Sequence, residues 1–353
     1  MGKDRLPPSI YLLSFFPIAA AKRIWYNIFN TVSVSVSAVE DKMNTKLFTE
    51  YAKKLVESCG KVILGKDDAI KNIGICLVAG GHVLLEDLPG TGKTMLLRAF
   101  ARSIGGDFKR IQFTPDILPS DLTGIHFYDQ KRGEFEFRRG PLFANVVLAD
   151  EINRAVPRSQ SALLEVMEEK QISVDGETFR LDEPYIVMAT QNPVESYGTF
   201  PLPEAQLDRF MMKLSLGYMT PEQEKQVLQR EETKKIVDTL STVITHEELN
   251  ALRAQYREVE IKDDVLNYLM SIITATRESD KLNYGVSARG SIALCQASRI
   301  HAAMEGRGYV IPEDVKKLAV PVLAHRISTL SRKHLSSAAY LEGLLDELPV
   351  PLE

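Results

Sequence analysis

The sequence predicts an α/β fold, in which a parallel sheet with helices on both faces is followed by a smaller helical domain. Three observations support this prediction. Short apolar runs alternate with segments of helical periodicity as far as about residue 218. Beyond that residue the pattern is helical. Within the first part, an apolar strand at 83–85 runs directly into a glycine-containing turn and a helix.

Composition narrows the class of protein. With 353 residues the chain is long enough for two domains, and 44% hydrophobic and 25% charged residues are typical of a globular protein. A net charge of −4 gives no electrostatic argument for nucleic acid as the main partner. The cysteines, Cys59, Cys76 and Cys295, are scattered. They predict a reducing, cytoplasmic compartment without a disulfide framework, and their spacing does not suggest zinc.

Residues 43–218 carry the alternating pattern. Apolar positions at helical spacing predict helices at 45–59, 66–80, 94–104 and 159–169. Compact apolar runs predict buried strands at 83–85, 111–113, 146–149, 186–189 and 210–216. Two hairpins, at 124–138 and 172–181, interrupt this rhythm, and the second contains the turn dipeptide Asp175-Gly176. Both are expected to be insertions into the α/β core.

Residues 219–335 are predicted to form a small all-helical domain. Its first helix starts at Thr220, a cap residue, followed by proline at the first helical position. Further helical patterns cover 246–257, 262–278, 287–305 and 312–330. Residues 336–353 are expected to be a C-terminal tail, in which the Pro- and Leu-rich stretch 344–353 is irregular.

The first predicted strand leads into a candidate phosphate-binding loop. Backbone N–H groups at the start of a helix bind phosphate, and glycines let the backbone approach it closely. Lys93 is placed for the β- and γ-phosphates of ATP, and the Thr94 hydroxyl for Mg²⁺. The usual motif begins with glycine where this chain has Asp87, a departure expected to be harmless. An ordinary strand–turn–helix junction is the alternative, but the context favours a nucleotide site formed by Pro89, Gly90, Thr91, Gly92, Lys93, Thr94 and Met95.

A second block, Val146–Glu151, predicts the hydrolytic half of the site. Its apolar residues form a buried strand, and Asp150 and Glu151 follow at the carboxyl end, where open α/β sheets bind ligands. Asp150 is placed to hold Mg²⁺ through water, and Glu151 to polarise the attacking water as a general base. A hydrophobic run before Asp-Glu is often only a strand end, but its position after a phosphate loop favours the functional interpretation.

Three further residues complete the predicted site. Asn192 follows the fourth strand, where its amide can orient the water or contact the γ-phosphate, although Asn-Pro pairs are also common in turns. Arg209, and Arg289 at a helix start in the second domain, would supply positive charge to the transferring phosphoryl group, in cis or in trans. Either arginine can equally be an ordinary surface residue.

Taken in order, these blocks resemble the AAA+ ATPases and, more narrowly, the MoxR family. The resemblance covers roughly residues 43–330 and implies a P-loop NTPase core followed by a helical lid. It rests on eight blocks: Leu84–Thr94 (LLEDLPGTGKT), Arg110–Gly124 (RIQFTPDILPSDLTG), Phe137–Pro141 (FRRGP), Ala149–Arg154 (ADEINR), Ser159–Glu169 (SQSALLEVMEE), Ala189–Pro193 (ATQNP), Phe200–Phe210 (FPLPEAQLDRF) and Val286–Arg289 (VSAR).

The resemblance implies a role for several residues. Asn192 would be the sensor-1 residue, and Arg209 the arginine finger that acts on ATP held by a neighbouring subunit. Arg289 would be the sensor-2 arginine, which couples the lid to the γ-phosphate. Residues 63–65, which include Gly65, fall where the family packs the adenine. The first hairpin corresponds to the insertion that marks this branch, and the second to its pre-sensor hairpin.

The resemblance also implies partners. Members of the family form rings, commonly hexamers, with ATP bound between subunits, and act as chaperone-like remodellers of proteins, often with partners that contain a von Willebrand factor A domain. A nucleic-acid-dependent motor and a low-turnover ATP-binding switch stay open as alternatives. The basic residues Lys131, Arg132, Arg138 and Arg139 on the first hairpin suit nucleic acid, an acidic protein segment or a solvated surface. The predicted catalytic residues argue against a pure switch.

The first 42 residues have no counterpart in this pattern. Lys3 and Arg5 precede an apolar stretch at 10–21, which weakly resembles a secretory signal. That stretch is too short for a transmembrane span, so no stable membrane insertion is expected. An ATPase would find no ATP outside the cytoplasm, which argues against a secretory signal. We therefore favour Met43 as the natural start, with residues 1–42 a poorly ordered extension or upstream of the true start.

Overall fold

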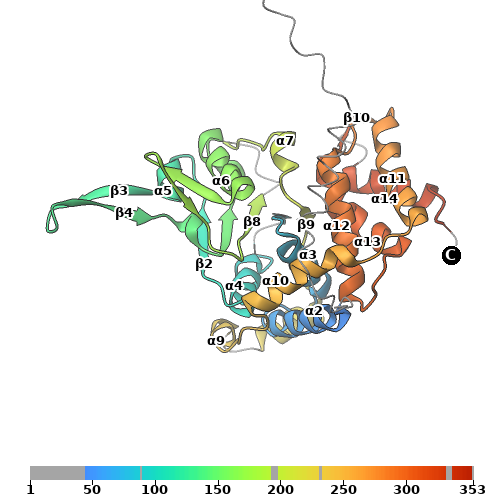
Figure 1. The fold of residues 1–353 in the computed structure, drawn as a ribbon, viewed down its shortest axis with the longest axis horizontal. Helices are drawn as coiled ribbons and strands as arrows, with labels where there is room; N and C mark the ends of the chain where they lie inside the picture. Colours follow the sequence, from blue (N-terminus) through green and yellow to red (C-terminus); the bar gives the residue numbers. More distant parts are fainter. Residues whose placement is uncertain (1–43, 88–89, 192–197, 230–232, 331–335, 352–353) are drawn as a thin grey trace, which may run out of the picture. The chain divides into compact units, whose positions relative to one another are not determined.

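The computed structural model describes residues 44–87, 90–191, 198–229, 233–330 and 336–351 (Figure 1). The predicted extension and two predicted site residues, Pro89 and Asn192, lie outside the described residues. Residues 43–353 form one compact unit. The boundary at residue 218 therefore stays a prediction.

A five-stranded parallel sheet lies in this unit, as the sequence predicts (Figure 1). The strand order is β2-β5-β8-β1-β9, and all neighbours are parallel. The carboxyl ends of the strands therefore meet at one edge, where the phosphate loop and the acidic block both begin. The strands are β1 (Val83–Glu86), β2 (Phe108–Gln112), β5 (Val146–Asp150), β8 (Ile186–Gln191) and β9 (Met212–Leu214).

The two strands at the edges of the sheet differ most from their predicted bounds. The strand predicted at 111–113 is β2, which begins earlier, at Phe108. Three of its five residues are exposed, so its first half lacks the apolar run by which a buried strand is recognised. The strand predicted at 210–216 is shorter, because β9 spans only Met212–Leu214.

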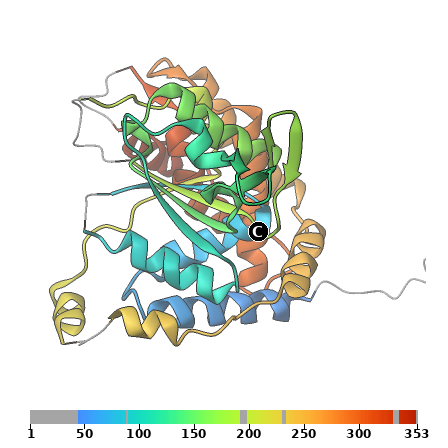
Figure 2. The ribbon, with the colours of Figure 1, turned by 90° about the vertical axis from the view of Figure 1, so that its left-hand side faces the viewer.

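Side chains on the two faces of the sheet enter two separate cores. Val83 and Leu85 pack with α2, α3 and α4, whereas Leu84 between them packs with α6 on the opposite face. Figure 2 shows α2 and α4 on one side of the sheet and α6 on the other. These helices are α2 (Thr45–Gly60), α3 (Asp67–Ala79), α4 (Lys93–Ser103) and α6 (Pro157–Glu169), close to their predicted spans.

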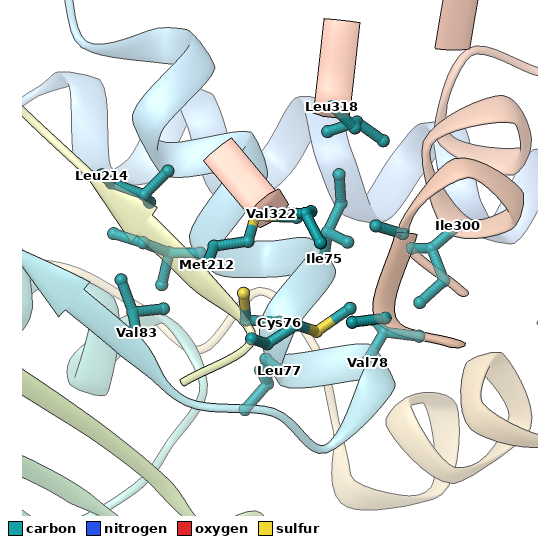
Figure 3. Close-up of a cluster of buried hydrophobic side chains, with 14 of the residues drawn as sticks. Ile75, Cys76, Leu77, Val78, Val83, Met212, Leu214, Ile300, Leu318 and Val322 are labelled. Carbon is teal, nitrogen blue, oxygen red and sulfur yellow. The ribbon is translucent and has the colours of Figure 1, made fainter. Parts of the chain in front are cut away.

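Helix α3 is buried on several sides and joins the sheet to the C-terminal helices. Its residues Ile75 and Val78 lie in one cluster with Met212 of β9 and with Ile300 and Val322 of the C-terminal region (Figure 3). All five side chains are at most 1% exposed. The sheet and the C-terminal helices therefore share one apolar core through α3.

The region after β9 is helical, as predicted. Among the described residues, no helix is both long and apolar enough to cross a membrane. The helices are α8 (Pro221–Leu228), α9 (Thr233–Asp238), α10 (His246–Gln255), α11 (Asp263–Glu278), α12 (Ala288–Met304), α13 (Pro312–Leu323) and α14 (Ser337–Glu347).

Two predictions for this region are wrong in detail. The helix predicted at 312–330 ends at Leu323, and a 3₁₀ turn, η4 (Ala324–Arg326), leads into β11 (Ser328–Thr329), which pairs antiparallel with β10 (Leu282–Tyr284). Strands this short carry no readable alternation. The stretch predicted to be irregular from residue 344 is still helical to Glu347, because Leu341 and Leu345 bury the apolar face of α14.

Both predicted hairpins are present and contact each other. The first consists of β3 (Gly124–Asp129) and β4 (Glu134–Arg139), and the second of β6 (Gln171–Val174) and β7 (Glu177–Arg180). Phe137 of the first stacks on Phe179 of the second, with ring centroids 4.6 Å apart. His126 Nδ1 lies 2.9 Å from Asp175 Oδ2. The extended ribbon β3–β4 is visible in Figure 1.

A buried histidine connects three elements at the base of the sheet. His82, just before β1, accepts a hydrogen bond at Nδ1 from the amide of Val187 (3.0 Å) and donates from Nε2 to the carbonyl of Met167 (2.9 Å). This pair of contacts requires the neutral ring with its proton on Nε2. Burial lowers the pKa of His82 to about 4.

Folding stability is expected to fall as the pH decreases from about 6.5 towards 4, by about 3 kcal/mol through His82, because the unfolded histidine takes up a proton that the folded one does not. Denaturant unfolding at a series of pH values measures this slope. In His82→Gln the slope should be smaller, although the protein is less stable overall. An unchanged slope in the variant would show that other groups cause it.

Candidate active site

A cavity of about 340 Å³ lies at the carboxyl edge of the sheet. That volume lies within the size range of pockets for small ligands. The cavity brings together the phosphate loop after β1, the acidic residues after β5 and the end of β8. It is lined by Asp87, Gly90, Thr91, Gly92, Lys93, Thr94, Met95, Arg110, Asp150, Glu151, Thr190 and Gln191.

The loop before α4 has the backbone that phosphate binding requires. Gly90 and Gly92 have φ angles of +85° and +87°, which side chains other than glycine rarely adopt. A Cβ added at Gly92 would also lie 3.1 Å from Cδ1 of Ile63. No side chain caps the first turn of α4 in the described chain. The residues of that turn, Lys93, Thr94 and Met95, line the cavity, so the amide groups of Lys93 and Thr94 stand at a helix start of the kind that binds anions.

Asp87 has a structural role that the sequence did not reveal. The motif usually has glycine there, and the departure was expected to be harmless. Asp87 is 5% exposed, and its carboxylate accepts hydrogen bonds from Ser215 Oγ (2.8 Å), Leu216 N (2.8 Å) and Gly217 N (3.0 Å). Its backbone carbonyl accepts a hydrogen bond from Lys93 Nζ (3.1 Å). Asp87 thus fastens the start of the phosphate loop to the segment after β9.

Asp150 is held in one orientation at the end of β5. Thr190 Oγ1 donates to Asp150 Oδ1 (2.7 Å), and Arg110 Nη2 lies 2.6 Å from Asp150 Oδ2. Oδ2 accepts from both Nε (3.1 Å) and Nη2 of Arg110, whereas Oδ1 accepts from Thr190 and still has a lone pair for a ligand. A carboxylate oriented in this way suits a hydrated Mg²⁺ ion, which binds few protein groups directly.

Glu151 is placed by an unusual backbone conformation. Its φ of +57° lies in the left-handed region, which costs a non-glycine residue on the order of 1–2 kcal/mol. Its amide donates to Thr190 Oγ1 (2.8 Å), and its carboxylate is held by Gln112 Nε2 (2.8 Å) and Arg154 Nε (3.1 Å). The strained turn therefore keeps a carboxylate at the cavity next to Asp150, where a general base would be needed.

Four side chains that hold Asp150 and Glu151 were not predicted from the sequence: Thr190, Arg110, Gln112 and Arg154. Thr190 lies in β8, within the sequence block Ala189–Pro193, in which only Asn192 was predicted to act. Arg110 and Gln112 flank the buried Ile111 on the edge strand β2, so both point to the same face. That alternation was the only available signal, and it becomes meaningful only when β2 is known to pair with β5.

The residues that line the cavity fit ATP and Mg²⁺. Lys93 and the start of α4 supply positive charge and amide donors for phosphate groups. Thr94 offers a hydroxyl and Asp150 a carboxylate, and oxygen ligands of this kind suit Mg²⁺.

The predicted adenine residue Gly65 does not line this cavity in the described chain. It has a φ of +66° and lies against the side chain of Gln223 at the start of α8.

The two predicted arginines lie together but apart from the cavity. Neither Arg209 nor Arg289 is among the described residues that line the cavity. Both instead contact Glu168 of α6: Arg209 Nη2 lies 3.1 Å from Oε2, and Arg289 Nη2 lies 2.5 Å from Oε1. About a third of the Arg209 side chain and nearly half of Arg289 are exposed. One surface therefore presents two guanidinium groups around a single carboxylate.

The phosphate loop, the acidic pair and the helical region define a class of nucleotide-dependent enzymes, and sequence comparison identifies it. Residues 82–212 match the family described as ATPase family associated with various cellular activities (AAA), and residues 274–340 match the AAA lid domain. The chain is thus an AAA protein with its lid.

Individual relatives narrow the class. Chaperone MoxR1 of Mycobacterium tuberculosis is 41% identical, and the match covers 76% of this chain and 73% of that protein. Protein MoxR of Methylorubrum extorquens is 31% identical, and the match covers 79% of this chain and 88% of that protein. The uncharacterized protein YeaC of Bacillus subtilis is 52% identical, and the match covers 85% of this chain and 95% of that protein. A crystal structure of a candidate ATPase from Cytophaga hutchinsonii, 37% identical, superposes with a TM-score of 0.81 over 89% of this chain and 100% of its own. The chain belongs to the MoxR family of AAA+ ATPases.

Thr190→Val is expected to lower ATP turnover by about 10- to 100-fold, because the hydroxyl orients both Asp150 and the turn at Glu151. ATP binding measured without turnover should change little, since the phosphate loop is untouched. Thr190→Ser retains the hydroxyl and is the matched control. Equal turnover in the valine and serine variants would contradict an orienting role.

Proposed function

We propose that this chain binds ATP with Mg²⁺ and hydrolyses it. One observation carries the proposal: Lys93, Thr94, Asp150 and Glu151 line a single cavity. Lys93 and the amides of α4 hold the phosphates, and Thr94 and Asp150 hold Mg²⁺. Glu151 accepts the proton of the attacking water. Asn192, which lies outside the described residues, is proposed as the sensor that orients this water.

We further propose that the site is completed by a neighbouring subunit. The transition state of phosphoryl transfer needs positive charge beyond that of the metal ion, and an arginine can supply it in trans. Arg209 and Arg289 lie together outside the cavity of their own chain, on the surface around Glu168. Both are therefore available to ATP held by the next subunit of a ring, which the family resemblance implies to be a hexamer.

The work of this ATPase is proposed to be chaperone-like remodelling of protein partners in the cytoplasm. Support comes from the relative named Chaperone MoxR1. The β3–β4 hairpin adds a structural argument, because Ile125, Tyr128 and Phe135 are 47%, 53% and 73% exposed. Exposed apolar side chains of this kind suit contact with protein. A partner with a von Willebrand factor A domain is the expectation from the family resemblance.

The same hairpin gives little support to a nucleic-acid motor. Its two basic pairs flank Glu134 and Glu136, and Arg132 lies 3.9 Å from Asp129 and 3.7 Å from Glu136. Arg139 covers the ring of Phe143, 5.1 Å from its centroid. The surface is thus mixed in charge, whereas a nucleic-acid footprint is a basic patch.

Arg209→Ala is expected to lower turnover about 10³-fold with little loss of ATP binding, because the arginine contributes to the transition state of a neighbouring site. Turnover and ATP affinity are measured separately at a concentration that supports assembly. Arg180→Ala, on β7, is the control for loss of a surface arginine. Normal turnover in Arg209→Ala would remove the assignment.

Glu151→Gln is expected to bind ATP and retain it, because the proton acceptor is lost while the phosphate loop is intact. Mixed with Arg209→Ala, this variant should restore part of the turnover, since each supplies the group that the other lacks. Recovery above the sum of the two separate activities would support action in trans. No recovery in assemblies shown to contain both variants would contradict it.

A further inference from the structure

The turn η4 is hydrogen-bonded to the chain segment that carries Arg209. Arg326 of this turn is 4% exposed. Its Nε donates to Asp208 Oδ1 (2.8 Å), and its Nη2 donates to the carbonyls of Asp208 (3.1 Å) and Phe210 (2.7 Å). Its Nη1 donates to the carbonyls of Met211 (3.0 Å) and Val322. A guanidinium has five N–H groups, so every donor of Arg326 has an acceptor.

A second side chain of η4 strengthens this contact. His325 is buried, and its Nε2 lies 2.8 Å from the carbonyl oxygen of Phe210 and 2.9 Å from Nη1 of Arg326. Burial and the neighbouring Arg326 hold the pKa of His325 well below its usual range, so the ring is neutral. The carbonyls on both sides of Arg209, those of Asp208 and Phe210, are therefore fixed by η4, while the Arg209 side chain itself reaches Glu168.

The same aspartate also holds the segment that carries Arg289. Ser287 Oγ donates to Asp208 Oδ1 (3.1 Å) and Oδ2 (3.0 Å), and Ser287 Oγ also caps α12 by accepting from Gly290 N (3.2 Å). Arg289 lies in the first turn of that helix. Asp208 is thus the common partner of two groups. One is Arg326, which holds the segment that carries Arg209, and the other is Ser287, which caps the helix that carries Arg289.

We infer that Arg326, through Asp208, is a positioning residue for the arginines that act on the neighbouring subunit's ATP. The inference rests on the proposed function of Arg209 and adds the device that sets its geometry. A buried arginine with five hydrogen bonds is hard to replace, because lysine offers one compact ammonium group with three donors. Removal of Arg326 is expected to free the backbone at 208–211, and none of its hydrogen bonds described above involves the phosphate loop.

The energetics favour a fixed geometry over a loose contact. A buried guanidinium without partners would be strongly unfavourable, so the segment 208–211 can leave Arg326 only if other acceptors replace its carbonyls. Burial lowers the pKa of Arg326, and the neighbouring carboxylate of Asp208 opposes this effect. Positional accuracy matters for turnover, since a misplacement of about 1 Å can lower a rate about 100-fold.

The test uses the full-length assembled protein with Arg326→Lys and with the milder Asp208→Asn, which keeps one oxygen acceptor. Both variants are expected to lower turnover about 10- to 100-fold and to leave ATP affinity unchanged. The matched control is Asp314→Asn. Asp314 is 1% exposed and accepts from Arg307 Nη2 (2.6 Å), so it is a second buried carboxylate of the helical region paired with an arginine, and it has no part in the Asp208 contacts. Turnover in this control should stay within about twofold.

A mixing experiment separates positioning from general damage. Glu151→Gln subunits lack their own proton acceptor but carry an intact Arg209, so mixing them with Arg326→Lys should restore turnover as it does for Arg209→Ala. Recovery with both partners supports the inference. Recovery with Arg209→Ala but not with Arg326→Lys or Asp208→Asn overturns it, and so does an equal loss of turnover in Asp314→Asn. No recovery with Arg209→Ala overturns the proposed action in trans itself.

Discussion

The site depends on the register between three parallel strands. Ala189 of β8 pairs with Leu84 of β1 on one side and with Ala149 of β5 on the other. Asp150 and Thr190 each follow this line by one residue, which is why their side chains meet. A slip of one residue would turn either side chain to the opposite face of the sheet. The hydrophobic residues on both faces fix this register, because a shift would exchange the two cores.

Much of this arrangement is predictable from the sequence, because its signals are local. The apolar run Val146–Ala149 followed by two acids defines a strand and its carboxyl end, and the glycines at 90 and 92 mark a turn before a helix. Both hairpins were predicted from turn residues between short apolar stretches. The parallel sheet follows from the alternation of strands and helices, since crossovers of that length place helices on both faces.

The contacts that were missed join residues far apart in sequence. Arg326 and Asp208 are 118 positions apart, and Ser215 and Asp87 are 128 apart. Nothing near Arg326 distinguishes it from a surface arginine at a helix end, because its acceptors are mostly backbone carbonyls that every residue has. The same limit explains β10 and β11, whose pairing depends on where α11 and α13 end. Composition and periodicity report burial and local geometry, but they do not report which buried groups meet.

Two of the missed sets of contacts, those of Arg326 and those of Asp87, lie on either side of the edge strand β9. This strand has three residues and pairs with β1. The segment before it, residues 208–211, is bound by η4 and carries Arg209. The segment after it, residues 215–217, is bound by Asp87 at the start of the phosphate loop. Buried charged side chains therefore fix the chain on both sides of β9, Arg326 before the strand and Asp87 after it. Within one chain, this short strand separates Arg209, which lies outside the cavity, from the segment that holds the phosphate loop.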